Sequence, residues 1–141
     1  MKTPALLTAA VLAMALLAEP ASARATETVW LSSLELTNVT QGWGQAQADK
    51  SVTGKQLSIG GRHFEHGVGT HAESVMRLEL AGRAERFSAW VGVDDDARSD
   101  QARIAFRVIG DGKTLFRSSP MKLGQGASKV EVDLRGIKTL L

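Results

Sequence analysis

The chain of 141 residues contains no cysteine and no run of basic residues, and after its first two dozen residues it has no long apolar run. Without cysteine it can form no disulfide, no thiolate zinc site and no cysteine nucleophile. Its 17 basic residues exceed its 15 acidic ones only slightly and are scattered, so the composition argues against a nucleic-acid-binding surface. A fold without disulfides has to be held by apolar burial, helped at most by a metal.

The apolar run stands at the very start of the chain. A basic Lys2 precedes it, and Ala21, Ser22 and Ala23 form a small-x-small cleavage signal. This pattern is typical of a secretory signal peptide over residues 1–23, and the run is too short for a membrane-spanning helix. We therefore expect a secreted or periplasmic product without a membrane segment after cleavage, in which residues 24–141 form one domain.

Alternation of apolar and polar residues predicts strands in the remainder. The alternation is clearest over residues 86–93, 103–108 and 129–135. Asp111-Gly112 is a hairpin signal, because glycine tolerates a positive φ. Short strands between glycine-rich turns favour an all-β fold, an antiparallel β-sandwich.

Two tryptophans and the last residues complete this prediction. Trp30 and Trp90 fall in expected strands, and we assign both to the core. Residues 136–141 read as the opening of a further apolar strand. Because an unpaired apolar edge is unfavourable, we expect the sandwich to lack its last strand here.

All three histidines lie within nine residues, at His63, His66 and His71. Glycines between them break any helix, which disfavours a zinc site, and no G-x-S-x-G nucleophile elbow is present. The segment reads instead as a strand that runs into a glycine turn, with His63 and His66 on its wet face. His71, beside Thr70 and Ser74, then either binds a small polar ligand or bonds to nearby backbone.

Two loops offer further candidate groups. The acidic loop Asp94–Asp96 suits calcium, which takes carboxylate and carbonyl oxygens, or it is a solvated turn; the EF-hand spacing is absent. Trp43 stands between two glycines and is either a core plug or an exposed platform, on which the apolar C–H face of a sugar stacks.

Taken in order, these segments resemble the NPCBM family of carbohydrate-binding modules, associated with glycoside hydrolase family 98. The matching motifs include "LSSL", "GWG", "DKS", "IGG", "GVGTHAES", "VGVDD", "IGDGK" and "VDLRGIKTLL", over residues 29–141. The resemblance implies a galactose-binding-like sandwich of the jelly-roll kind, without catalytic activity. It also implies binding of terminal galactose or N-acetylgalactosamine, a structural calcium ion, and attachment to a secreted glycoside hydrolase such as an α-galactosidase.

The resemblance also suggests site residues. His71 matches the family's "GTHA" motif, and we expect it to bond sugar hydroxyls together with loop carboxylates while Trp43 stacks on the ring. The expected ligand-binding residues are His71, Trp43, Ser74, Glu73, Asp94 and Asp95, and the expected metal ligands are Asp49 and Asp96. The family continues past "KTLL" with a strand and an acidic segment near its calcium, so we expect a C-terminally incomplete module with an affected calcium site.

Two other functions remain open from the residues alone. One is a glycosidase fragment whose carboxylates come from Glu65, Glu73 or the Asp94–Asp96 loop. The other is an exported interaction protein whose loops bind no sugar. In each case we expect a monomer.

Overall fold

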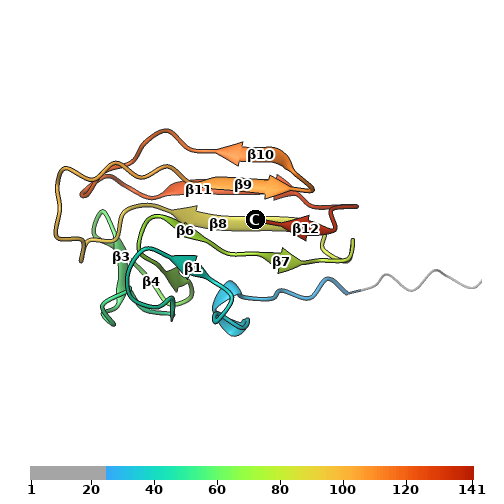
Figure 1. The fold of residues 1–141 in the computed structure, drawn as a ribbon, viewed down its shortest axis with the longest axis horizontal. Coiled ribbons are helices and arrows are strands. Elements are labelled where there is room, and N and C mark those ends of the chain that lie inside the picture. The colour runs from blue at the N-terminus through green and yellow to red at the C-terminus, as the bar shows by residue number, and fades with distance from the viewer. Residues whose placement is uncertain (1–24) are drawn as a thin grey trace, which may run out of the picture.

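The computed structural model describes residues 25–141, and the expected signal peptide lies outside these residues (Figure 1). Apart from one 3-10 turn, η1 (Leu31–Ser33), the regular elements of the described part are strands. None of the helical structure found there is long and apolar enough to cross a membrane.

Twelve strands are formed by the described residues. They are β1 (Thr40–Gln41), β2 (Gln47–Ala48), β3 (Leu57–Ile59), β4 (Arg62–Phe64), β5 (Val68–Gly69), β6 (Ser74–Val75), β7 (Leu78–Glu79), β8 (Arg86–Val91), β9 (Arg107–Gly110), β10 (Lys113–Arg117), β11 (Ser128–Asp133) and β12 (Thr139–Leu140).

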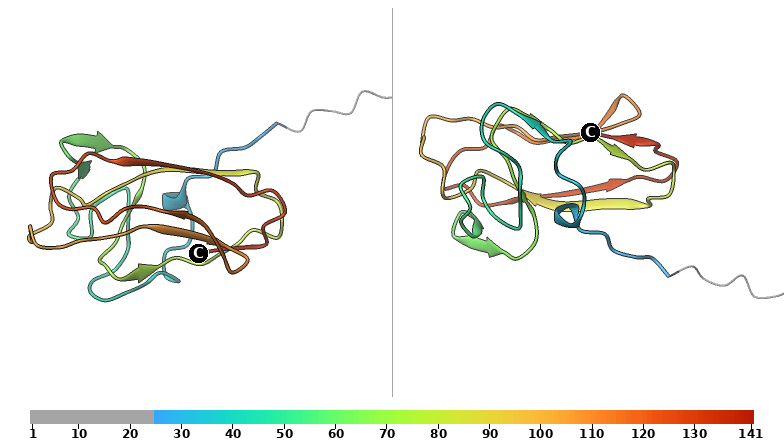
Figure 2. Two further views of the ribbon diagram at one scale, coloured as in Figure 1. Left: turned by 90° about the horizontal axis from the view of Figure 1, so that it is seen from above. Right: turned by 60° about the horizontal axis from the view of Figure 1, so that its bottom comes forward.

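The longer strands form two layers, seen in Figure 1 and from other directions in Figure 2. One layer has the order β10-β9-β12-β7, the other is the β8–β11 pair, and every pairing is antiparallel. Three short pairs, β1–β6, β2–β5 and β3–β4, complete the chain. Strands β1, β3 and β4 lie together at the lower left of Figure 1.

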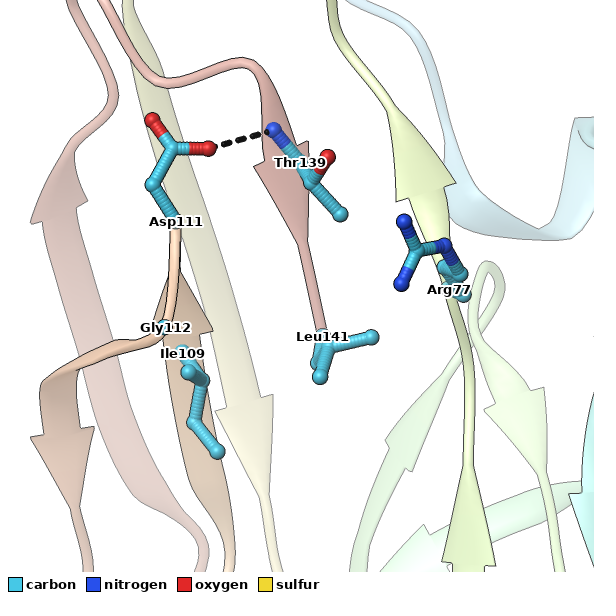
Figure 3. Close-up of a pocket in the computed structure, with 6 residues that line it drawn as sticks. All are labelled: Arg77, Ile109, Asp111, Gly112, Thr139 and Leu141. Carbon is cyan, nitrogen blue, oxygen red and sulfur yellow. Dashed lines mark hydrogen bonds between the residues drawn. The ribbon is translucent and has the colours of Figure 1, made fainter.

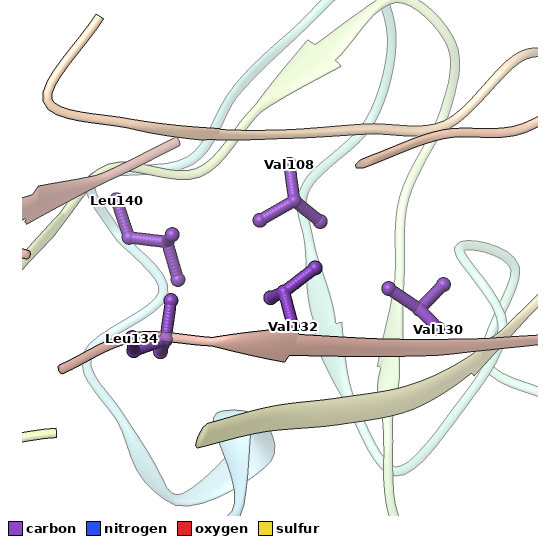
Figure 4. Close-up of a cluster of buried hydrophobic side chains, with 5 residues drawn as sticks. All are labelled: Val108, Val130, Val132, Leu134 and Leu140. Carbon is purple, nitrogen blue, oxygen red and sulfur yellow. The ribbon is translucent and has the colours of Figure 1, made fainter. Parts of the chain in front are cut away.

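The core lies between the two layers. Val108 and Leu140 of the four-stranded sheet face side chains of the other layer, namely Val130, Val132 and Leu134 (Figure 4). Lys129, Glu131 and Asp133 point to solvent. Residues 129–135 thus alternate between buried and exposed, as their sequence pattern predicts for a strand with one face in the core. The expected antiparallel β-sandwich is confirmed.

The expected hairpin is also confirmed. Asp111 and Gly112 have φ values of 47° and 79°, the conformation of a tight two-residue turn, and Lys113 pairs with Gly110. The strand before the turn is shorter than expected. The Phe106 N–H donates to the Ser118 hydroxyl at 2.9 Å instead of to a ladder carbonyl, and regular pairing begins only after it.

The two tryptophans assigned to the core are exposed, so that prediction is wrong. Trp30 lies in no strand, precedes η1 and is 52% exposed. Trp90 lies in β8 but is 41% exposed. Because Phe87 and Val91 turn inward, the strand's alternation directs Trp90 outward, where the Arg62 guanidinium lies 4.3 Å from its ring centroid.

Candidate functional site

Pairing of β1 with β6 brings two motifs together that are distant in the sequence. Gln41 lies opposite Ser74, and the Gly42 N–H donates to the Glu73 carbonyl at 3.1 Å. The Gly-Trp-Gly turn after β1 therefore lies against the segment from His71 to Ser74.

Trp43 projects from this turn beside His71. The two ring centroids are 5.8 Å apart with an interplanar angle of 61°, an edge-on arrangement that suits aromatic pairs. Trp43 is 59% exposed. Of the two alternatives for this side chain, the exposed platform describes it and the core plug does not. Gly44 has φ +69°, which side-chain-bearing residues rarely adopt, so the turn needs glycine there.

The Gln41 side chain stabilises the turn through a hydrogen bond. Its Nε2 donates to the Trp43 carbonyl at 2.6 Å, while its Oε1 is buried without a hydrogen-bond partner among the described residues. Sequence reasoning missed this residue. Its position directly before Gly-Trp-Gly, on the strand that carries the turn, is the signal that could have indicated it.

The remaining polar groups of the motif are exposed. The Ser74 hydroxyl bonds to Thr70 Oγ1 at 2.9 Å, and Thr70 is a second residue that the expected site did not include. Within residues 25–141 no hydrogen bond engages the Glu73 carboxylate or the His71 ring, so both are free to bond a ligand. The structure thus brings together four of the expected ligand-binding residues, Trp43, His71, Glu73 and Ser74.

Gly69 positions the histidine segment. It is buried, lies opposite Gln47 in the β2–β5 pair, and is followed directly by Thr70 and His71. A Cβ at this position would come within 2.1 Å of the Lys50 carbonyl oxygen. Only glycine allows the two backbones to approach this closely.

The aspartates expected to bind ligand lie in another network. The Asp94 carboxylate accepts the Ser58 N–H at 3.2 Å, and Asp95 accepts the N–H groups of Gly60 and Gly61 at 2.9 and 2.8 Å as well as the Ser58 hydroxyl. These bonds tie the β3–β4 hairpin to the loop after β8. Asp94 and Asp95 therefore stabilise the contact between the hairpin and this loop. Within the described chain, no hydrogen bond joins them to Trp43 or His71.

Acid should weaken this network through Asp95. The Ser58 hydroxyl and the N–H groups of Gly61 and Gly60 lower the pKa of Asp95 below its usual range. A carboxyl with a lower pKa in the folded chain stabilises the fold above its unfolded pKa of about 3.9, and this stabilisation is lost as pH falls through the folded pKa.

We expect Asp95→Asn to lower the free energy of unfolding by about 1 kcal/mol at pH 7, a modest loss because solvent screens this exposed group. At pH 3 the variant should differ less from the unchanged chain. Urea unfolding at the two pH values measures both, with Asp100→Asn as the matched control. An equal difference at pH 7 and pH 3 would contradict the role given to the ionised carboxylate.

The two expected metal ligands lie in separate networks. Asp49 accepts the Gly67 N–H at 2.9 Å, whereas Asp96 contacts the Lys55 ammonium and the Ser51 and Thr53 hydroxyls. No three His, Cys, Asp or Glu side chains of residues 25–141 are grouped so that they could hold a metal. Because a lysine already occupies the Asp96 carboxylate, these side chains do not fit a carboxylate-rich calcium site. Calcium binding stays a prediction.

A pocket of about 310 Å³ lies beside the end of β12 (Figure 3). Both of its charged side chains are engaged. Asp111 accepts the Thr139 N–H at 2.9 Å, and Arg77 pairs with Glu79 at 2.9 Å. Sugar recognition needs polar groups free to bond hydroxyls, so this pocket is a poorer candidate than the Trp43–His71 surface.

Comparison with known proteins shows the family of this chain. The family model of the NPCBM/NEW2 domain matches residues 27–141. Alpha-1,3-galactosidase B of Akkermansia muciniphila is 34% identical over 113 residues, which is 77% of this chain and 14% of that protein. The chain spans only 7–14% of the length of the curated relatives that it matches.

Solved structures give the same result. The CBM51 module of GH95 from Clostridium perfringens, in complex with methyl-galactose, has a TM-score of 0.71 and 32% identity, covering 79% of this chain and 82% of that one. The CBM51-2 and INT domains of Clostridium perfringens ZmpB, with CBM51-2 in complex with GlcNAc, have a TM-score of 0.71 and 27% identity, covering 79% of this chain and 25% of that one. The resemblance inferred from the motifs is confirmed: the chain belongs to the NPCBM/NEW2 domain family and is a carbohydrate-binding module domain.

Proposed function

We propose that this module binds terminal galactose-type sugars at the surface formed by Trp43, His71, Glu73 and Ser74. The observation that carries the proposal is the exposed Trp43 indole, held edge-on to His71 at 5.8 Å by a glycine turn. In this arrangement the aromatic platform and the polar groups needed for a sugar lie side by side.

The chemistry of a pyranose suits such a surface. One face of a galactose ring is rich in C–H groups, which pack on an aromatic face, while its hydroxyls need partners. The free Glu73 carboxylate can accept hydrogen bonds from sugar hydroxyls, and the His71 imidazole can donate or accept hydrogen bonds. Few groups are buried on an open surface, so we expect a dissociation constant in the micromolar to millimolar range.

Support for a galactose-type ligand comes from the module solved with methyl-galactose, which is 32% identical and has a similar length. A second neighbour was solved with GlcNAc. A titration therefore has to distinguish galactose from N-acetylglucosamine.

We also propose the setting in which the module works. A signal peptide over residues 1–23 would export it, and it would serve a glycoside hydrolase without taking part in catalysis. The relative named as a galactosidase supports this association, because the matched segment is a small part of that protein. Weak binding is useful in such a setting, since tethering an enzyme to a glycan surface raises its local substrate concentration.

Indole signals give a sharp test. The chain has three tryptophans, so its ¹⁵N–¹H spectrum has three indole N–H signals, which Trp→Phe variants assign. During titration with methyl β-galactoside we expect the Trp43 signal to shift, and Trp43→Ala to weaken binding about tenfold because stacking is lost. Trp90→Ala is the matched control, since it removes an exposed tryptophan that belongs to β8 and packs against Arg62 instead of His71. Methyl β-glucoside and N-acetylglucosamine test the sugar class. Equal affinity for all three sugars would overturn the galactose assignment, and an unmoved Trp43 signal would overturn the site.

A further inference from the structure

A second tryptophan–histidine pair lies outside the proposed site. The Trp30 and His66 ring centroids are 4.5 Å apart with an interplanar angle of 31°, so the imidazole covers part of the indole. Trp30 nevertheless remains 52% exposed, and the His66 side chain is 43% exposed. Trp30 packs on a histidine, but about half of its surface is open to water. Burial in the core therefore does not account for this large aromatic side chain.

A carboxylate completes this second group. Asp49 Oδ1 accepts the Gly67 N–H at 2.9 Å and lies 3.5 Å from His66 Nδ1. Its side chain is 42% exposed. Hydrogen bonds from Ser32 and Gly67 lower the pKa of Asp49, so the carboxylate stays ionised at neutral pH. The lone pairs of this carboxylate that face solvent can still accept hydrogen bonds from a ligand.

We propose that Trp30, His66 and Asp49 form a second glycan-contact site, on which a pyranose ring packs against the indole while its hydroxyls bond the carboxylate and the imidazole. The second group resembles the first: it has an exposed indole, an adjacent imidazole and a carboxylate that accepts the Gly67 N–H and is still 42% exposed. A sugar ring can pack on the indole and donate hydroxyl hydrogen bonds to the solvent-facing lone pairs of the carboxylate, whereas a purely apolar partner would cover this charge without bonding to it. The inference rests on the proposed function in one respect only, namely that the ligand is a glycan.

The two sites lie close to one another along the chain. Strand β5 separates them, with His66 two residues before it and His71 two residues after it. Five residues of fully extended chain span at most about 17 Å, so the Cα atoms of His66 and His71 are no farther apart than this. Two weak contacts at such a distance can engage one glycan surface together and strengthen retention on it beyond either affinity.

The test combines the indole signals with retention on galactose-agarose. We expect the Trp30 signal to shift during titration with lactose, including in the Trp43→Ala variant where the first site is lost. We expect Trp30→Ala to leave the affinity for methyl β-galactoside at Trp43 within about twofold and to lower retention on the resin at least about threefold, because one of two contacts is removed. His66→Ala keeps the indole and should lower retention in the same direction, which guards against a folding defect in Trp30→Ala. Trp90→Ala again serves as the control.

The outcomes separate the two proposals. A Trp30 signal that stays in place at saturating lactose, with retention unchanged in Trp30→Ala and His66→Ala, overturns the second site and leaves the first intact. A Trp30 signal that shifts while that of Trp43 does not supports the second site and overturns the first. A shift of Trp30 in the presence of both lactose and its glucose-terminated analogue maltose supports the site and shows that it does not select galactose.

Discussion

Replacing Gly69 with alanine is expected to lower the free energy of unfolding by about 3 kcal/mol or more. The new Cβ would lie 2.1 Å from the Lys50 carbonyl oxygen and 2.7 Å from the Ser51 Cα. Both are backbone atoms and cannot move aside as a flexible side chain can, so β5 has to separate from the Lys50–Ser51 segment. Thermal unfolding should show a midpoint lower by about 10 °C or more.

The same substitution should also impair sugar binding. His71 follows Gly69 by two residues, and displacement of β5 moves its imidazole relative to Trp43. We expect the affinity for methyl β-galactoside to fall at least about tenfold, since a stacked and hydrogen-bonded ligand loses part of its contacts. Titration below the unfolding transition separates this effect from the loss of stability.

Two other glycines provide controls of different kinds. A Cβ on Gly126 would meet no atom within 4 Å, and Gly126→Ala should change stability by less than about 0.5 kcal/mol. Gly61 also has open space but a φ of +81°, so Gly61→Ala should cost about 1 kcal/mol through backbone strain alone. If Gly69→Ala cost no more than Gly61→Ala, close backbone contact would not be the reason for glycine at residue 69.

The second large effect is expected in the core. Leu134→Ala should lower the free energy of unfolding by about 2–5 kcal/mol, because the side chain is 2% exposed and its loss leaves a cavity between the two layers. Figure 4 shows Leu134 facing Leu140, which belongs to the opposite sheet. Truncation therefore weakens one of the contacts that hold β12, which also pairs with β7 and β9.

Chemical denaturation with an unchanged m-value would measure this loss. Leu141→Ala is the control, because Leu141 is 37% exposed and its truncation should cost less than about 1 kcal/mol. Sugar affinity of the folded fraction should stay the same in both variants, since neither residue belongs to the Trp43–His71 surface. A similar loss of stability for the two leucines would mean that Leu134 does not carry the core packing described here.

Local periodicity predicted the sandwich well where one face of a strand is buried. Alternation identified the inward side chains of β11, and Asp111-Gly112 identified the hairpin, because side-chain direction and positive φ are properties of a few neighbouring residues. The same alternation pointed Trp90 outward. Its position in the strand decided its exposure, so membership of a strand did not place this tryptophan in the core.

The sequence by itself determined the fold class, the family and the motifs that carry Trp43 and His71, because these depend on residue type, order and local spacing. Tertiary structure decided which side chains these residues contact. Pairing of β1 with β6 placed Trp43 beside His71, and hydrogen bonds from the β3–β4 hairpin engaged the Asp94 and Asp95 carboxylates. It also joined Trp30 to His66, which no pattern in the sequence connects. Contacts between distant segments depend on how the strands pair and cross in space, and a period read along one segment carries no information about them.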